Sequence, residues 1–127
     1  MVDKSSSPYF PGRAPIDAYG NGGFRFAEMS HRGALIMTAS GVFGAVSATP
    51  DELALEALAR LKGEAEYQTV LLLGTGRAQV FPLAATRKAF AEAGIGLEAM
   101  DTGAAARTYN VLLVEKRPVA AALLAVD

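Results

Sequence analysis

The sequence predicts one α/β domain with three layers, in which helices cover a mixed central sheet. The first third carries short apolar runs separated by glycine-rich turns, which is typical of neighbouring antiparallel strands. The remainder alternates in the order α-β-α-β-α-β, and such alternation gives parallel strands joined by right-handed crossovers. At 127 residues, the chain has the length of a single domain.

Residues 1–15 are expected to form a flexible N-terminal arm, followed by one domain over residues 16–127. The arm contains three serines and three prolines and lacks hydrophobic periodicity. Within it, Tyr9 and Phe10 are the side chains that we expect to anchor the arm to the domain.

The strand-rich part begins with a hairpin, Ile16–Tyr19 and Phe24–Ala27, because Gly20-Asn21-Gly22-Gly23 supplies the positive φ angles of a tight turn. A polar bend is predicted at Ser30-His31-Arg32. Two apolar runs of strand length follow it, at Ala34–Thr38 and Gly41–Ser47.

The first helix has clear signals at both ends. Thr49 is its predicted cap, Pro50 suits the first helical position, and Glu52 completes a capping box. Gly63 is expected to end the helix. The run Tyr67–Leu73 then predicts a central strand that is covered on both faces.

Two further helices and two strands complete the domain. The second helix is predicted from Phe81-Pro82 to Gly94, with Leu83 facing inward, and a strand over Ile95–Met100 follows it. Asp101 or Thr102 caps a third helix over residues 104–115, whose apolar VLLV segment predicts deep burial. The last strand spans residues 119–125.

Composition excludes several classes of function. A net charge of −1 argues against nucleic acid as a partner. Without cysteine and with one histidine, the chain can form neither a disulfide nor a histidine-cluster metal site, and we expect no metal or cofactor. The start of the chain lacks the apolar core of a signal peptide, and the apolar runs are too short to span a bilayer. We therefore expect a cytoplasmic protein that is not integral to a membrane.

One glycine motif is rejected on context. Residues 94–99 match the dinucleotide pattern G-x-G-x-x-A. That fingerprint needs a strand before it and a helix after it, so that backbone amides point at a pyrophosphate. Here the motif follows a helix and opens a strand, so Gly94 is interpreted as a helix stop.

Polar residues gather after the strands at residues 67–73 and 95–100. If these strands are parallel, their carboxyl ends share one edge, where α/β proteins bind ligands. One interpretation is a small-molecule or anion pocket. The other is a tight strand exit, with Asp101 capping a helix and a carboxylate pairing with Arg107. The candidate pocket residues are Gly74, Thr75, Gly76, Arg77, Glu98, Asp101, Thr102, Arg107, Thr108 and Asn110.

The sequence contains no recognisable set of catalytic residues. Nearby carboxylates are not distinguishable from a cap plus a salt bridge, and the single histidine is predicted in an exposed bend. The alternation Phe24-Arg25-Phe26 predicts a half-buried strand that presents Arg25 on an exposed sheet face, where a partner protein could dock.

The segments IDAYGNGGFRFAE, VLLLGTG and GIGLEAMDTGAAARTYNVLLVEKRPVAAALL resemble one family over residues 16–126. This is a small α/β domain family of uncharacterised bacterial and archaeal proteins that includes the adipogenesis-associated domain protein and mitochondrial NADH dehydrogenase (complex I) assembly factor 3. The resemblance implies a mixed central sheet and no known activity or cofactor. It also implies protein partners, such as respiratory-complex subunits or another assembly factor.

Two hypotheses follow from the sequence. The first is a non-catalytic protein-interaction module that assists assembly of respiratory complex I. The alternative is a small-molecule or anion-binding protein, or an enzyme, that uses the strand ends near Gly74–Arg77 and Asp101–Arg107. The lack of catalytic machinery favours the first.

Overall fold

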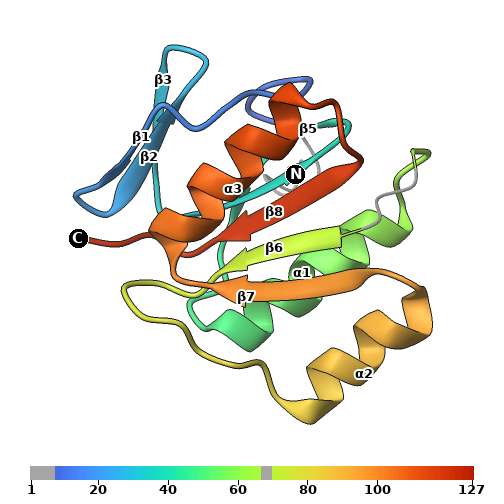
Figure 1. Cartoon of the computed structure of the whole chain (residues 1–127). Helices are drawn as coiled ribbons and strands as arrows, with labels where there is room; N and C mark the ends of the chain where they lie inside the picture. The colour runs from blue at the N-terminus through green and yellow to red at the C-terminus, as the bar shows by residue number, and fades with distance from the viewer. Residues whose placement is uncertain (1–7, 67–69) are drawn as a thin grey trace, which may run out of the picture.

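The computed structural model describes residues 8–66 and 70–127. Within these residues the chain forms eight strands and three helices (Figure 1). In chain order they are β1 (Ala18–Gly20), β2 (Gly23–Phe26), β3 (Met29–Arg32), β4 (Ala34–Thr38), β5 (Gly41–Ala45), α1 (Pro50–Lys62), β6 (Val70–Gly74), α2 (Ala84–Ala93), β7 (Gly96–Met100), α3 (Thr102–Val114) and β8 (Val119–Leu123). The predicted fold class is confirmed. Residues 67–69 of the predicted strand at 67–73 and residues 1–7 of the arm lie outside the described residues.

The central layer is a five-stranded mixed sheet of order β5-β4-β8-β6-β7. β6 pairs in parallel with both β7 and β8, whereas β4 pairs antiparallel with β5 and β8. Helices α1 and α2 cover one face, and α3 covers the other beside the small sheet β1-β2-β3 (Figure 1). Burial on both faces explains why β4, β6 and β8 are apolar along their length.

The small sheet confirms the predicted hairpin and corrects the predicted bend. Asn21 and Gly22 both have positive φ, as a two-residue hairpin turn requires. Residues 29–32 form strand β3, paired antiparallel with β2, and not a polar bend. The turn between them uses Ala27 and Glu28 at φ 48° and 62°, residues that carry no turn signal in the sequence.

The described part of the N-terminal arm is anchored as predicted. Tyr9 N donates to Val42 O at 2.7 Å, and Val42 N donates to Phe10 O at 2.9 Å. The arm therefore adds a short antiparallel bridge to the outer edge of β5. Pairing of this kind covers an edge that would otherwise be open to other chains.

Helix α1 matches its sequence signals. The Thr49 side chain accepts a hydrogen bond from Glu52 N, and α1 ends at Gly63. Helix α2 begins at Ala84, later than predicted, and the side chain of Leu83 is 66% exposed instead of facing inward. The N-terminus of α2 is held by Asp51 of α1, which accepts hydrogen bonds from Leu83 N and Thr86 Oγ1.

Helix α3 begins at Thr102 and is capped by Asp101, whose Oδ1 accepts from Ala104 N at 2.8 Å. The predicted deep burial of its second half is wrong, since Val111 and Val114 are 57% and 81% exposed. Only one face of α3 rests on the sheet, and Ala105 and Tyr109 contribute to that buried face.

Candidate functional site

The structure brings together the two strand ends that the sequence singled out. β6 and β7 are parallel, and Gly74 lies opposite Met100 at their carboxyl ends. Across this edge, Thr75 N donates to Met100 O and Thr102 N donates to Gly76 O, each at 2.8 Å. The expected shared edge is therefore present.

Hydrogen bonds within the fold engage the polar groups at this edge. Thr102 Oγ1 accepts from Gly76 N at 3.0 Å and donates to Leu124 O at 2.7 Å. Thr75 Oγ1 donates to Ala78 O at 2.6 Å. The amides that could hold an anion are thus already bonded, and Thr102 is fully buried.

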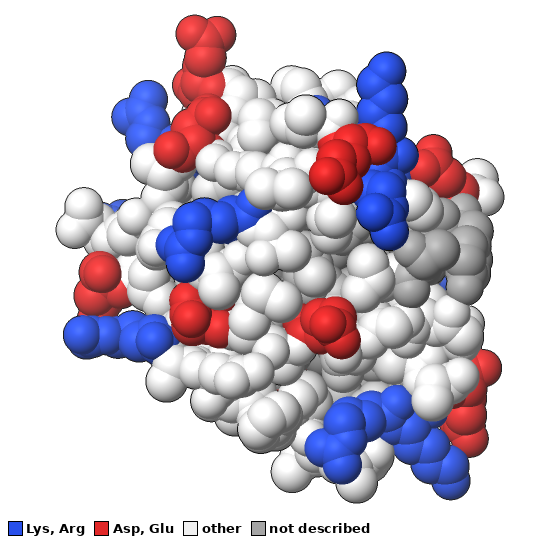
Figure 2. Space-filling view, viewed as in Figure 1, with Lys and Arg blue, Asp and Glu red and all other residues white. Residues whose placement is uncertain are grey.

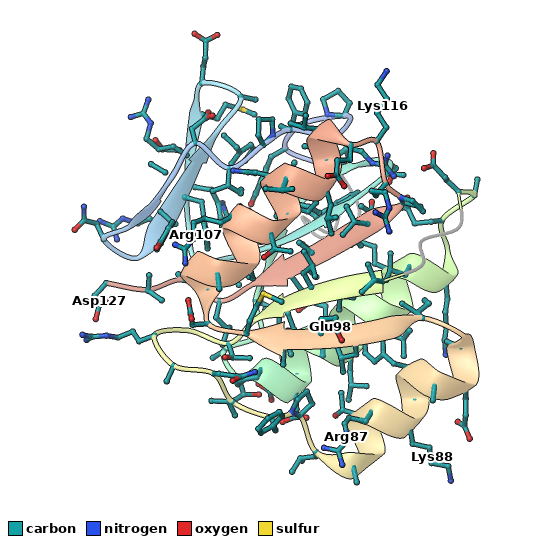
Figure 3. All side chains as sticks on the ribbon, viewed as in Figure 1. Arg87, Lys88, Glu98, Arg107, Lys116 and Asp127 are labelled. Carbon is teal, nitrogen blue, oxygen red and sulfur yellow. The ribbon has the colours of Figure 1, made fainter. Side chains whose placement is uncertain are left out.

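The remaining candidate residues do not belong to this hydrogen-bonded cluster. Arg107 Nη1 lies 3.5 Å from Tyr19 Oη, and among the described residues Arg107 has no ion pair with a carboxylate. Asn110 bonds the backbone of Ile16, Thr108 is half-buried on α3, and Arg77 is exposed. Figure 3 shows Glu98 on β7 at a distance from Arg107.

The outer edge of β7 is the most accessible part of the central sheet. Because Met100 O bonds to β6, the alternation of a parallel ladder turns the backbone groups of Leu97 and Ala99 away from β6. Ala99 O accepts from the Gln79 side chain at 2.8 Å. No strand of the described residues pairs with this edge, in contrast to the β5 edge.

Exposed apolar side chains lie beside this edge. In the loop before α2, Val80, Phe81 and Leu83 are 44%, 75% and 66% exposed. The loop and β7 enclose a shallow cavity of about 310 Å³, lined by Gln79, Phe81, Pro82, Arg87, Leu97, Glu98 and Ala99. We call the loop 80–83 together with Leu97, Glu98 and Ala99 the β7-edge surface.

The cavity at the β7-edge surface is lined by one exposed carboxylate, Glu98, and one exposed guanidinium, Arg87. Glu98 has no ion pair among the described residues, and Arg87 Nη1 donates to Pro82 O at 2.7 Å. From the side of α3, charged side chains are dispersed and not gathered into a patch (Figure 2). In residues 8–66 and 70–127, no three side chains of the metal-ligating kind cluster together.

This arrangement can bind an extended peptide chain. An open strand edge offers main-chain hydrogen bonds, and neighbouring pockets select side chains. Of these residues, Glu98 was predicted from the sequence, whereas Val80, Phe81 and Leu83 were not. The available signal was the apolar run of residues 80–83, in which Phe81-Pro82 was interpreted as the start of a helix with Leu83 facing inward, but the helix begins later, at Ala84.

Comparisons with known proteins agree with the fold. A family model described as "protein of unknown function (DUF498/DUF598)" matches residues 16–124. An uncharacterised protein of Rhodobacter capsulatus is 43% identical over 92% of this chain and 89% of its own length.

Solved structures are similar throughout the chain. One, described as an outer membrane protein from Bartonella henselae, is 48% identical with a TM-score of 0.84, covering 94% of this chain and all of that one. A Mth938-like domain protein of Bordetella pertussis is 32% identical with a TM-score of 0.73, covering 88% and 85% of the two chains. In the described part of this chain, no helix has the length and apolarity needed to cross a membrane.

Proposed function

The chain belongs to the DUF498/DUF598 family of proteins of unknown function, and we propose that it is a non-catalytic protein-interaction module that binds an extended segment of a partner protein along β7. The observation that carries this proposal is an open strand edge beside three exposed apolar side chains. Monomeric proteins seldom leave such an edge uncovered without a use for it.

The partner segment adds to β7 as a further strand. The outward backbone groups of Leu97 and Ala99 bond to its main chain, and Ala99 O exchanges the Gln79 side chain for a partner amide. Phe81 and Leu83 contact an apolar side chain of the segment. Glu98 favours a basic residue at the opposite position, because opposite charges on facing strands attract.

A second copy of this chain fits the β7 edge less well than a different protein does. The symmetric antiparallel register centred on Glu98 would place two Glu98 carboxylates opposite each other, which is unfavourable. Measuring the molecular mass of the isolated protein in solution distinguishes the two cases. A heterologous partner predicts a monomer, whereas a dimer that dissociates on Phe81→Ser would contradict the proposal.

The resemblance to a complex I assembly factor supports a finer proposal, in which the partner is a respiratory-complex subunit or another assembly factor. Affinity purification from native membranes followed by mass spectrometry is expected to enrich NADH dehydrogenase subunits. Normal complex I assembly in a deletion strain would contradict this finer proposal and leave the β7-edge surface to be tested by itself.

The test of the β7-edge surface uses paired variants. The double variant Phe81→Ser/Leu83→Ser removes apolar side chains from the surface, and Val111→Ser/Val114→Ser removes equally exposed ones from α3. We expect the first variant to lose the purified partner and the second to retain it. Equal recovery of the same proteins by both variants would rule out this surface as the docking site.

A second candidate is a ligand pocket at the strand ends near Gly74–Arg77 and Asp101–Arg107. It is favoured by the exposed guanidinium of Arg77 beside the shared edge of β6 and β7. A metabolite screen by thermal shift tests it, since a ligand at 100 times its dissociation constant adds about 2.7 kcal/mol of stability. Binding that persists in Arg77→Ala would count against this pocket.

A further inference from the structure

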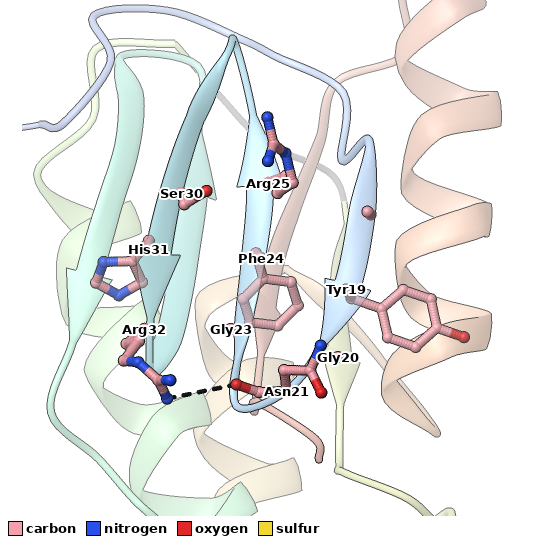
Figure 4. A pocket seen from close by; sticks show the side chains of 10 residues that line it. Tyr19, Gly20, Asn21, Gly23, Phe24, Arg25, Ser30, His31 and Arg32 are labelled. Carbon is pink, nitrogen blue, oxygen red and sulfur yellow. Dashed lines mark hydrogen bonds between the residues drawn. The ribbon is translucent and has the colours of Figure 1, made fainter.

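The small sheet β1-β2-β3 has one face in the core and one face in solvent. Phe24 and Phe26 of β2 point inward and are 2% and 1% exposed, packed in the core layer beneath α3. Strand alternation places Arg25, between them, on the outer face. A hollow of about 310 Å³ lies on this side of the sheet (Figure 4).

Residues with little or no side chain form the floor of the hollow. They are Ala18, Gly20, Gly23 and Ser30. Gly23 is required by close packing, because a Cβ at this position would collide with the backbone carbonyl of His31 on β3. The floor of the hollow therefore has short side chains or none between the longer side chains that border it.

Two arginines border this floor. In the strand register, Arg25 lies opposite Ser30 and Arg32 lies opposite Gly23, so the two arginines are diagonal neighbours on the same face. Diagonal neighbours are about 7–8 Å apart, within reach of long side chains. Figure 4 shows the two arginine side chains at opposite ends of the hollow, Arg25 on β2 and Arg32 on β3 beside Asn21.

The two guanidinium groups lack a counter-charge. In residues 8–66 and 70–127 the Arg25 guanidinium has no hydrogen bond or ion pair, and Arg32 Nη1 has one long bond of 3.4 Å to Asn21 O. No aspartate or glutamate lines the hollow. The His31 ring, which donates through Nε2 to Ala34 O, carries no negative charge that could balance the arginines.

We propose that this hollow binds the oxyanion group of a small ligand, either a phosphate ester or a carboxylate. Guanidinium groups bind such anions through paired, charge-assisted hydrogen bonds, and the side chains of Arg25 and Arg32 are long enough to turn toward one anion over the floor of the hollow. The Ser30 hydroxyl is a third polar group at the floor.

The size of the hollow favours a small molecule. Its volume lies at the lower end of the range for small-molecule sites, about 300–1,000 Å³. Nucleic acid would need a more extended basic surface than two arginines on a chain of net charge −1. This site lies on the small sheet and is independent of the β7-edge surface.

The experiment is an NMR titration of the full chain with inorganic phosphate and, separately, with citrate, at constant ionic strength. We expect saturable shifts of the Gly20, Gly23 and Ser30 amides. Saturation by phosphate alone assigns a phosphate ester, and saturation by citrate alone assigns a carboxylate. Shifts that reproduce those caused by sodium chloride would overturn the proposal.

Charge-matched variants distinguish specific anion binding in the hollow from non-specific electrostatic attraction to the protein. Arg25→Gln/Arg32→Gln removes two positive charges from the hollow, and Lys62→Gln/Lys88→Gln removes two from exposed positions elsewhere. We expect the first variant to weaken binding about tenfold or more, as loss of charge-assisted bonds does, and the second to leave it unchanged. Equal weakening in both variants, or none in the first, would overturn the proposal. Arg25→Lys/Arg32→Lys should retain part of the affinity, which separates lost binding from misfolding.

Discussion

The side chain of Asn110 on α3 bonds both backbone groups of Ile16. Asn110 Oδ1 accepts from Ile16 N at 2.8 Å, and Asn110 Nδ2 donates to Ile16 O at 2.8 Å. The amide side chain thus replaces a neighbouring strand for the segment that enters β1. Asn110 was a candidate pocket residue, and this contact gives it a structural use.

Asn110→Ala should lower the free energy of unfolding by about 2–4 kcal/mol, because a buried backbone group left without a partner costs about 1–3 kcal/mol. Ile16 is buried, so water does not readily replace the lost bonds. Urea unfolding measures the effect. The neighbouring variant Val111→Ala, at an exposed position, is the control and should change stability little. If both variants unfold at the same urea concentration, the contact is not stabilising.

Thr102→Val should also destabilise the protein, by about 1–3 kcal/mol, because it leaves the Gly76 amide and the Leu124 carbonyl without their shared hydroxyl. The hydroxyl joins β6, α3 and the chain after β8. Thr102→Ser retains the hydroxyl and should keep most of the stability. A valine variant as stable as the serine variant in thermal unfolding would show that the hydroxyl contributes nothing.

Gly44→Ala should release the arm from β5 without unfolding the domain. A Cβ at Gly44 would lie 2.7 Å from Tyr9 Cε2 and 3.0 Å from His31 Cε1, so the Tyr9 ring must move. Hydrogen exchange should then accelerate at the amides of Tyr9 and Val42, which hold the arm. Ala45→Ser, at the end of the same strand, is the control. Unchanged exchange in Gly44→Ala would contradict the tight packing of Tyr9 on this glycine.

The free energy of unfolding should fall as the pH is lowered through the range in which His31 titrates. Burial lowers the pKa of His31 below 6.5, and its hydrogen bond to Ala34 O acts in the opposite direction. Because the unfolded chain then binds the proton more tightly, the free energy of unfolding falls as pH drops through 6.5 and levels below the folded pKa.

The pH prediction is checked in two ways. As the single histidine, His31 gives one set of imidazole NMR signals, whose midpoint should lie below 6.5. In His31→Gln, the fall in stability between about neutral pH and about pH 5 should be smaller than in the native chain. A midpoint at or above 6.5 would contradict the burial of the ring.

Alkaline pH should destabilise the protein through Tyr109. Burial raises its pKa from 10.0 to about 12, with the charge of Arg13 acting in the opposite direction. The stabilisation that comes from keeping this phenol neutral is complete below pH 10.0 and is lost as pH rises toward about 12. Tyr109→Phe should flatten the dependence over this interval in chemical unfolding. An equally steep dependence in the variant would assign it to other groups.

Several elements could be predicted from local signals. Helix α1 begins and ends where Thr49, Pro50 and Gly63 predict, because capping depends on neighbours along the chain. Gly20–Gly23 likewise predicts its hairpin, since few residues adopt positive φ. Strand β3 was missed because Ala27 and Glu28 adopt positive φ without glycine or asparagine, a cost that the surrounding sheet must offset.

The geometry of the candidate sites was likewise predicted only in part from the sequence. The alternation of helices and strands correctly predicted that the ends of β6 and β7 meet, because parallel order follows from crossover connections. It could not predict that Thr102 would bond Gly76, or that Arg107 would lie beside Tyr19, because those partners are distant in sequence. The open edge of β7 likewise depends on strand order, which only the folded sheet reveals.

Local sequence signals predicted the α/β class and the capped starts of α1 and α3, because helix capping and hydrophobic periodicity act between near neighbours along the chain. Long-range packing determines which polar groups are already bonded and which remain available. The amides of Thr75 and Gly76 are engaged within the fold, whereas Arg25, Glu98 and the outer edge of β7 face solvent. Availability depends on which surfaces pack together, and packing joins residues whose separation in sequence carries no local signal.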